Sequence, residues 1–168
     1  AEGLASAAYF GVFDQMILNQ KDVFHFDGRN RRPPRDRVNA ALSMTYTLLA
    51  HDCASALESV GLDAYVGFMH RDRPGRASLA LDLMEELRAP LADRFVLTLI
   101  NTRVLQQKHF KTQADGAVWL TDDGRKVLLS AWQSRKKVEI THPFLKEKMA
   151  WGLVPYVQAL LLARTLRG

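Results

Sequence analysis

Two acidic residues one helical turn apart carry the first chemical signal in this sequence. The segment 79–88 places leucines at a helical period, and between them Asp82 and Glu85 lie three positions apart, so they share one face of a helix. Glu86 is also a neighbour of Asp82, at a spacing of four. Like charges at these spacings repel, and Arg88, solvent or a divalent cation would compensate them. Taken alone, the helix is most simply a solvated acidic surface.

A histidine extends this pattern toward metal chemistry. His70 ends an apolar, strand-like segment at 64–70. The turn that follows it contains three basic residues, Arg71, Arg73 and Arg76. Positive neighbours favour the neutral imidazole, which is the form that binds metals. Two carboxylates with one imidazole suit Mg²⁺ or Mn²⁺ better than a structural zinc ion. A metal beside arginines is what phosphodiester chemistry requires, although a lone histidine here is more often structural.

A second basic segment occupies residues 27–37. Its arginines are Arg29, Arg31, Arg32, Arg35 and Arg37. Pro33 and Pro34 prevent a helix through this segment, so it is predicted to be a loop. A solvated connector and a flexible arm that binds phosphates both explain these residues, and the sequence alone favours neither.

The composition sets limits on the class of protein. The 168 residues, 48% of them hydrophobic, are enough for one domain with a real core, or for two small ones. The formal net charge of +5 permits an anionic partner without demonstrating one. Cys53 is the only cysteine, which excludes an internal disulfide and a thiolate zinc site and suits a reducing compartment. No apolar stretch approaches the roughly 20 residues of a membrane-spanning helix.

The hydrophobic periodicity predicts a mainly α fold: a helical bundle-like domain with one small β-hairpin. The predicted helices are 4–18, 38–60, 79–88, 90–105, 121–134 and 144–166, with Pro155 kinking the last. The hairpin is predicted at 108–112 and 117–120. Because apolar residues surround nearly the whole of helix 4–18, we expect it to be buried, with Gly11 allowing close approach of a neighbouring backbone.

Several blocks of sequence occur in a recognisable order. They are residues 1–3 with 9–10, 32–34 with 36–40, 61–63 with 67–70, 72–76, and 79–88. In this order they resemble the CRISPR-associated integrases of the Cas1 family, the nucleases of spacer acquisition. The resemblance covers most of residues 1–105, and the histidine followed by the acidic helix is its most specific part.

The resemblance implies a domain and a ligand set. Residues 1–168 would be the C-terminal helical domain that holds the active site, without the N-terminal β domain of the family. The catalytic metal ligands would be Glu2, His70 and Glu85, with Asp82 as a further metal contributor and Asn39 and Tyr46 as supporting residues. Periodicity independently places Asn39 and Tyr46 on one face of helix 38–60, away from its apolar face.

The implied reaction is a metal-dependent phosphodiester transfer. A spacer 3′-hydroxyl attacks a phosphate in the CRISPR repeat, with Mg²⁺ or Mn²⁺ as cofactor; with water as the nucleophile, the same site would be an endonuclease. The arginines at 71–76 and 29–37 become candidate phosphate contacts. The implied partners are spacer and repeat DNA, the adaptation protein Cas2 and a second copy of the full-length protein, in the prokaryotic cytoplasm and without a membrane.

Two other classes of function remain open at this level. The first is a non-catalytic helical module that binds nucleic acid. This hypothesis explains the positive charge and the arginines, but it assigns no role to His70, Asp82 and Glu85. If the chain were instead a structural or interaction domain, adding divalent cations together with the chain would have no effect on DNA.

Overall fold

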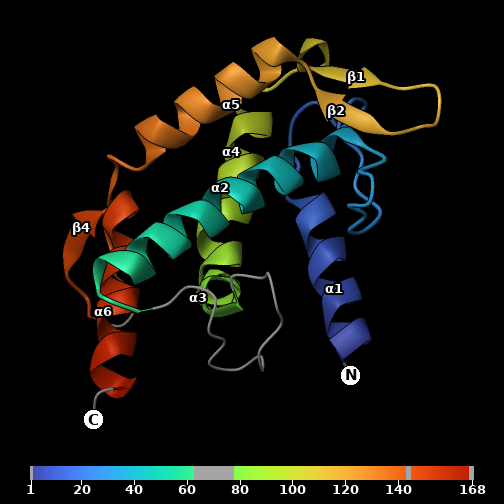
Figure 1. Cartoon of the computed structure of the whole chain (residues 1–168). Helices are drawn as coiled ribbons and strands as arrows, with labels where there is room; N and C mark the ends of the chain where they lie inside the picture. Colours follow the sequence, from blue (N-terminus) through green and yellow to red (C-terminus); the bar gives the residue numbers. More distant parts are fainter. Residues whose placement is uncertain (1, 63–77, 143–144, 167–168) are drawn as a thin grey trace. The chain divides into compact units, whose positions relative to one another are not determined.

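The computed structural model describes the backbone of residues 2–62, 78–142 and 145–166 (Figure 1). These residues form two compact units. One unit contains residues 1–45 and 92–130, and the other contains residues 46–91 and 131–168. The predicted segment 64–70, with His70, lies outside the described residues, as do Arg71, Arg73 and Arg76.

The first unit combines helices with one antiparallel strand pair. Its elements are α1 (Glu2–Gln15), the start of α2 (Arg37–Ser59), α4 (Arg94–Asn101), the 3₁₀ turn η2 (Gln107–His109), β1 (Phe110–Thr112), β2 (Val118–Leu120) and most of α5 (Asp122–Arg135). β1 and β2 pair with Phe110 opposite Leu120, which confirms the predicted hairpin. Phe24 packs edge-on against Phe110, so the core of this unit reaches the hairpin.

Helix α1 forms close to its predicted bounds, but it is not the buried helix that its composition suggested. Tyr9, Val12 and Met16 are 40%, 55% and 45% exposed, while Phe13 and Ile17 are buried. A Cβ atom on Gly11 would meet nothing within 4 Å, so the predicted close approach of another backbone at this residue is absent from the described part of the chain. The all-round apolar composition was therefore a poor guide to burial here.

Helix α2 has both of its ends specified by sequence. At its start, the Asp36 carboxylate accepts the backbone N–H of Asn39 at 2.7 Å, a side-chain cap for the unpaired first turn. At its end, Gly61 adopts a φ of 79° and the N–H of Leu62 reaches back to the carbonyl of Leu57. The prediction of a helix over 38–60 is confirmed to within one residue at each end.

The second unit contains the rest of α2 and the elements around the acidic helix. They are α3 (Ser78–Leu87), most of the π-helical turn η1 (Arg88–Asp93), the end of α5, β3 (Glu139–Thr141), β4 (Lys148–Ala150), the 3₁₀ turn η3 (Trp151–Leu153) and α6 (Val154–Leu166). The rings of Trp132 and Trp151 meet edge to face with centroids 4.7 Å apart, so these two tryptophans pack against each other in this unit.

Two boundaries in the second half of the chain were predicted wrongly. Instead of one helix over 144–166, the chain makes the antiparallel β3–β4 pair before α6 begins at Val154. Pro155 does not kink this helix. It lies in the first turn, where the backbone N–H makes no intrahelical hydrogen bond, so a proline loses none. The helix predicted for 90–105 is divided, with Pro90 inside η1 and α4 ending at Asn101. The mainly helical fold is confirmed, and the described residues contain two small strand pairs where one was predicted.

No helix among the described residues combines the length and the apolar character needed to cross a membrane.

Candidate functional site

The acidic helix α3 presents one apolar face and one acidic face. Leu79, Leu83 and Leu87 are 4%, 4% and 6% exposed, as their helical spacing predicted. Glu85 is exposed and Asp82 is half-buried, one helical turn away on the same helix. The buried apolar face therefore anchors α3 in its unit. This anchoring determines the side of the helix on which the two carboxylates lie.

Glu85 is held by an arginine on the next turn. An Arg88 guanidinium nitrogen lies 3.3 Å from a carboxylate oxygen of Glu85, and the guanidinium carbon lies 5.4 Å from the centre of the Tyr46 ring. Tyr46 is 9% exposed, so its ring is a fixed platform from α2. Tyr46 is thus linked to Glu85 only indirectly, through Arg88, and its supporting role stays a prediction.

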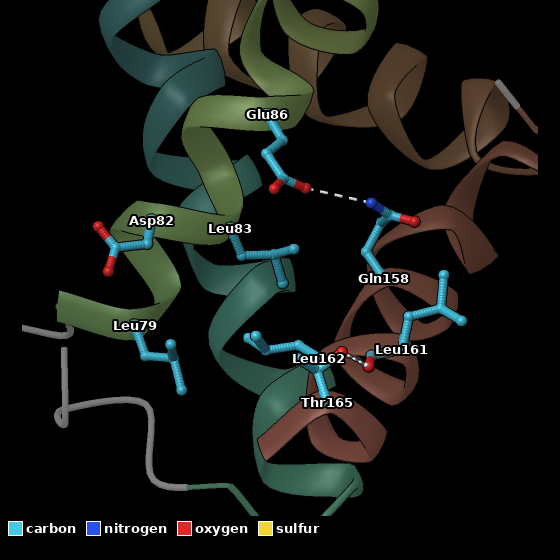
Figure 2. Close-up of a pocket in the computed structure, with 8 residues that line it drawn as sticks. All are labelled: Leu79, Asp82, Leu83, Glu86, Gln158, Leu161, Leu162 and Thr165. Carbon is cyan, nitrogen blue, oxygen red and sulfur yellow. Dashed lines mark hydrogen bonds between the residues drawn. The ribbon is translucent and has the colours of Figure 1, made fainter. Parts of the chain in front are cut away.

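Glu86 has a different set of partners. Its carboxylate accepts a hydrogen bond from the side-chain amide of Gln158 on α6 at 3.1 Å (Figure 2). The amide oxygen of Gln158 lies 2.8 Å from Nε2 of His142, which is fully buried. A hollow of about 220 Å³ beside these residues is lined by Leu79, Asp82, Leu83, Glu86, Gln158, Leu161, Leu162 and Thr165. No local sequence pattern indicates this contact of His142, because Gln158 is 16 residues away in the sequence.

The predicted metal ligands are described only in part. Asp82 and Glu85 lie together on α3, whereas His70 and the side chain of Glu2 lie outside the described residues. The helix of Glu2 belongs to the first unit and α3 belongs to the second. Among the residues that the structure does describe, no group of three or more His, Cys, Asp or Glu side chains is arranged to hold a metal ion. The four-residue ligand set therefore stays a prediction.

Asn39, in the first turn of α2, is hydrogen-bonded to the basic loop at residues 27–37. This side chain is fully buried, and its amide nitrogen donates to the carbonyl of Gly28 at 2.9 Å and to the Asp36 carboxylate at 2.7 Å. Its amide oxygen accepts the backbone N–H of Asn30 at 3.0 Å and a bond from the Arg29 guanidinium. Asn39 therefore fixes the path of the loop into α2. The periodicity placed Asn39 and Tyr46 away from the apolar face of this helix, yet both side chains are buried.

The five arginines of the loop divide into two groups. Arg29 also donates to the Ser43 hydroxyl at 3.1 Å and Arg37 donates to the carbonyl of Val23 at 2.9 Å, and both are half-buried. Arg35 is exposed, but donates to the carbonyl of Asp115 in the β1–β2 turn at 3.3 Å. Arg31 and Arg32 are exposed. The loop is thus an organised connector, and Arg31 and Arg32 are its most accessible charges for a phosphate.

A second buried histidine among the described residues, His109, lies in the first unit and has a structural partner. His109 Nδ1 accepts the backbone N–H of Gln106 at 3.0 Å. Burial, together with the neighbouring Lys108, lowers the pKa of His109 below its ordinary value of 6.5. A neutral imidazole is the form that accepts this hydrogen bond, so His109 caps the turn at η2.

Comparison with known proteins places these features in a family. The family model described as CRISPR associated protein Cas1 matches residues 1–134. The chain is 62% identical over 168 residues to "CRISPR-associated endonuclease Cas1 2" of Rhodospirillum rubrum, matching 100% of this chain and 49% of that protein. It is 56% identical over 167 residues to "CRISPR-associated endonuclease Cas1 1" of Chlorobaculum tepidum, matching 99% and 49%. The chain thus spans about half the length of these curated relatives.

Solved structures share the fold. A Cas1 protein from Thermotoga maritima matches with a TM-score of 0.86 and 26% identity, over 99% of this chain and 50% of that one. A casposase bound to integration product matches with a TM-score of 0.83 and 26% identity, over 98% and 48%. A chain of a Cas6-RT-Cas1–Cas2 complex matches with a TM-score of 0.77 and 28% identity, over 99% and 18%.

The chain belongs to the Cas1 family of CRISPR-associated proteins.

Proposed function

We propose that this chain carries the catalytic part of a metal-dependent DNA endonuclease and integrase, which joins a spacer 3′-hydroxyl to a phosphodiester of the CRISPR repeat. The observation that carries the proposal is the pair Asp82 and Glu85, presented one helical turn apart on α3 in a chain of the Cas1 family.

The donor chemistry of α3 fits Mg²⁺ or Mn²⁺. Asp82 and Glu85 offer carboxylate oxygens, the ligands that these hard cations prefer, and His70 and Glu2 complete the predicted set. When bound, the cation activates the attacking hydroxyl and neutralises charge that develops on the phosphate. The leucine face keeps α3 in place, so the carboxylates need little reorganisation to act as ligands.

The transfer itself needs no covalent enzyme intermediate. The spacer 3′-oxygen attacks the phosphorus atom and forms a new P–O bond, while the bond from phosphorus to the repeat 3′-oxygen breaks. The proton of the attacking hydroxyl ends on the departing oxygen by way of water, so atoms and charge balance. Arg31 and Arg32 are exposed, and we assign to them contacts with flanking phosphates, which carry no base sequence information.

The partners follow from the same proposal. A casposase of similar fold is bound to an integration product, and a Cas1 chain of similar fold belongs to a complex with Cas2. We infer that the parent protein of this chain binds spacer and repeat DNA, and that it associates with Cas2 and with a second copy of itself.

A strand-transfer assay tests the reaction. A labelled DNA with a free 3′-hydroxyl is incubated with a repeat-containing duplex and Mn²⁺, and joined products are separated by electrophoresis. We expect Asp82→Asn and Glu85→Gln each to reduce joining at least about 100-fold. Glu58→Gln, which removes the same charge from an exposed site on α2, is the matched control and should leave joining unchanged.

The assay is run in parallel on the Rhodospirillum rubrum relative, with calorimetric Mn²⁺ titration of the unmodified chain, Glu85→Gln and His70→Ala. If the relative joins DNA and this chain does not, the 168 residues are insufficient by themselves. Mn²⁺ binding that neither substitution changes would disprove the ligand assignment. Tighter DNA binding by Glu85→Gln without any metal response would instead support the non-catalytic nucleic-acid-binding module.

A further inference from the structure

A continuous chain of hydrogen bonds runs from the β3–β4 turn to the acidic helix. The backbone N–H of Leu145 donates to His142 Nδ1 at 3.1 Å. His142 Nε2 lies 2.8 Å from the amide oxygen of Gln158, and the amide nitrogen of Gln158 donates to Glu86 at 3.1 Å. All four residues belong to the second unit.

The direction of this chain is set at its buried end. Because Nδ1 of His142 accepts a backbone N–H, a neutral ring carries its proton on Nε2 and donates it to the Gln158 oxygen. That bond orients the amide of Gln158, so its nitrogen faces the carboxylate of Glu86. A flipped amide would place its nitrogen against the His142 donor and its oxygen against the Glu86 carboxylate. The turn between β3 and β4 therefore determines which group Gln158 offers to α3.

Burial increases the energetic importance of these hydrogen bonds. His142 is fully buried and Gln158 is half-buried, so a broken bond between them is poorly replaced by water. Around them, leucines from α3 and α6 line the 220 Å³ hollow. The leucine contacts keep the apolar face of α3 turned toward its unit, but they are not directional and leave small rotations of the helix open. The hydrogen bond between Gln158 and Glu86, although exposed, restricts these small rotations.

The bond between Gln158 and Glu86 also affects how the other acidic residues of α3 are oriented. Figure 2 shows Glu86 pointing toward Gln158, while Asp82, one turn earlier, points away from it. We propose that His142 is a positioning residue, which acts through Gln158 and Glu86 to set how α3 presents Asp82 and Glu85; the functional part rests on the proposed role of those carboxylates. Without the chain of bonds, small rotations of α3 would be less restricted.

Two substitutions interrupt the chain at different points. His142→Asn keeps an acceptor close to the position of Nδ1 for the Leu145 N–H, but removes the Nε2 donor. Gln158→Leu removes both amide groups and adds a side chain compatible with the neighbouring leucines. Glu86→Ala removes the last acceptor from an exposed helical position, and Glu58→Ala is the matched control on α2.

The first readout needs no metal. Amide hydrogen exchange across α3 should increase about fivefold in His142→Asn and in Gln158→Leu, as expected for one lost hydrogen bond. In a Glu86→Ala background, neither substitution should produce a further increase, since the chain is already cut. Exchange of α3 that is unchanged, or effects that add fully to that of Glu86→Ala, would overturn the positioning role. If His142→Asn does not fold, Gln158→Leu alone decides between these outcomes.

The second readout separates this proposal from the proposed function. Calorimetric Mn²⁺ affinity should fall about fivefold in His142→Asn and Gln158→Leu, and Glu58→Ala should match the unmodified chain. If exchange responds as expected while Asp82→Asn and Glu85→Gln bind Mn²⁺ normally, the positioning of α3 stands and the proposed function fails. If Asp82→Asn and Glu85→Gln abolish binding while the two interrupting variants bind normally, the proposed function stands and the functional role of His142 fails.

Discussion

Arg88 forms an ion pair with Glu85, three residues earlier on the chain, while its guanidinium lies over the ring of Tyr46. A proposed metal ligand is thus neutralised by a cation that α2 holds in place. Removing that cation should make Glu85 more available. We expect Arg88→Gln to bind Mn²⁺ about threefold more tightly by calorimetry, while stability changes by less than about 1 kcal/mol because the pair is exposed. Arg94→Gln removes the same charge from an exposed site in the first unit and serves as the control; equal effects would contradict a local role.

Arg31 and Arg32 should contribute to DNA affinity through charge alone. Each neutralised phosphate contributes about 0.9 to the slope of log affinity against log salt. We expect Arg31→Gln and Arg32→Gln each to weaken binding similarly on all duplex sequences and to reduce that slope by about one unit. Fluorescence anisotropy across a KCl series measures both quantities. A slope that stays constant in both variants would remove the loop from the DNA interface.

Asn39 should matter for stability. Asn39→Ala leaves the Gly28 carbonyl, the Asn30 N–H and the Arg29 guanidinium without their buried partner. At about 1–3 kcal/mol for a buried polar group left unsatisfied, we expect a loss of about 2–4 kcal/mol. Urea unfolding measures it, with the exposed Arg31→Ala as a control that should change stability by less than about 0.5 kcal/mol. A small effect for Asn39→Ala would mean that the loop is fixed by other contacts.

Cys53 should be inert and should make stability fall at high pH. Burial, followed by the neighbouring Asp52 carboxylate, raises the pKa of Cys53 from 9.0 to about 12. Between these values the unfolded thiol loses its proton and the folded thiol keeps it, so stability decreases as pH rises from about 9 toward 12. Comparison with Cys53→Ala over pH 8–10.5 isolates the effect, which should approach about 1.4 kcal/mol per pH unit above 9. Rapid alkylation of the folded chain at pH 8 would contradict the buried thiol.

Two glycines should respond to alanine in opposite directions. Gly11 lies within α1 with open space around its Cβ position, so Gly11→Ala should stabilise the chain by about 0.5–1 kcal/mol. A Cβ on Gly124 would lie 2.3 Å from the backbone oxygen of His109, so Gly124→Ala should destabilise it by more than about 2 kcal/mol. Thermal unfolding of the two variants makes the comparison, and a shift of the same sign in both would refute it.

Local patterns predicted much of this protein. The helical period predicted the bounds of α2 and the leucine face of α3, and the segments 108–112 and 117–120 predicted the β1–β2 hairpin. These features depend on residues within a few positions of one another, so they can be found without knowing the fold. The family resemblance is equally a property of sequence, because it rests on blocks in a fixed order.

Tertiary structure decided the features that depend on distant partners. A run of apolar residues predicted a helix at 144–166, but the backbone of 139–141 pairs with 148–150, and pairing overrides local propensity. Arg29 and Arg31 look alike in sequence, yet only the fold brings Asn39 to Arg29 and leaves Arg31 exposed. His142 acquires its meaning from Gln158 and Glu86, which are 16 and 56 positions away in the sequence. Sequence therefore determined which groups could do chemistry, and packing determined which of them are oriented, neutralised or accessible.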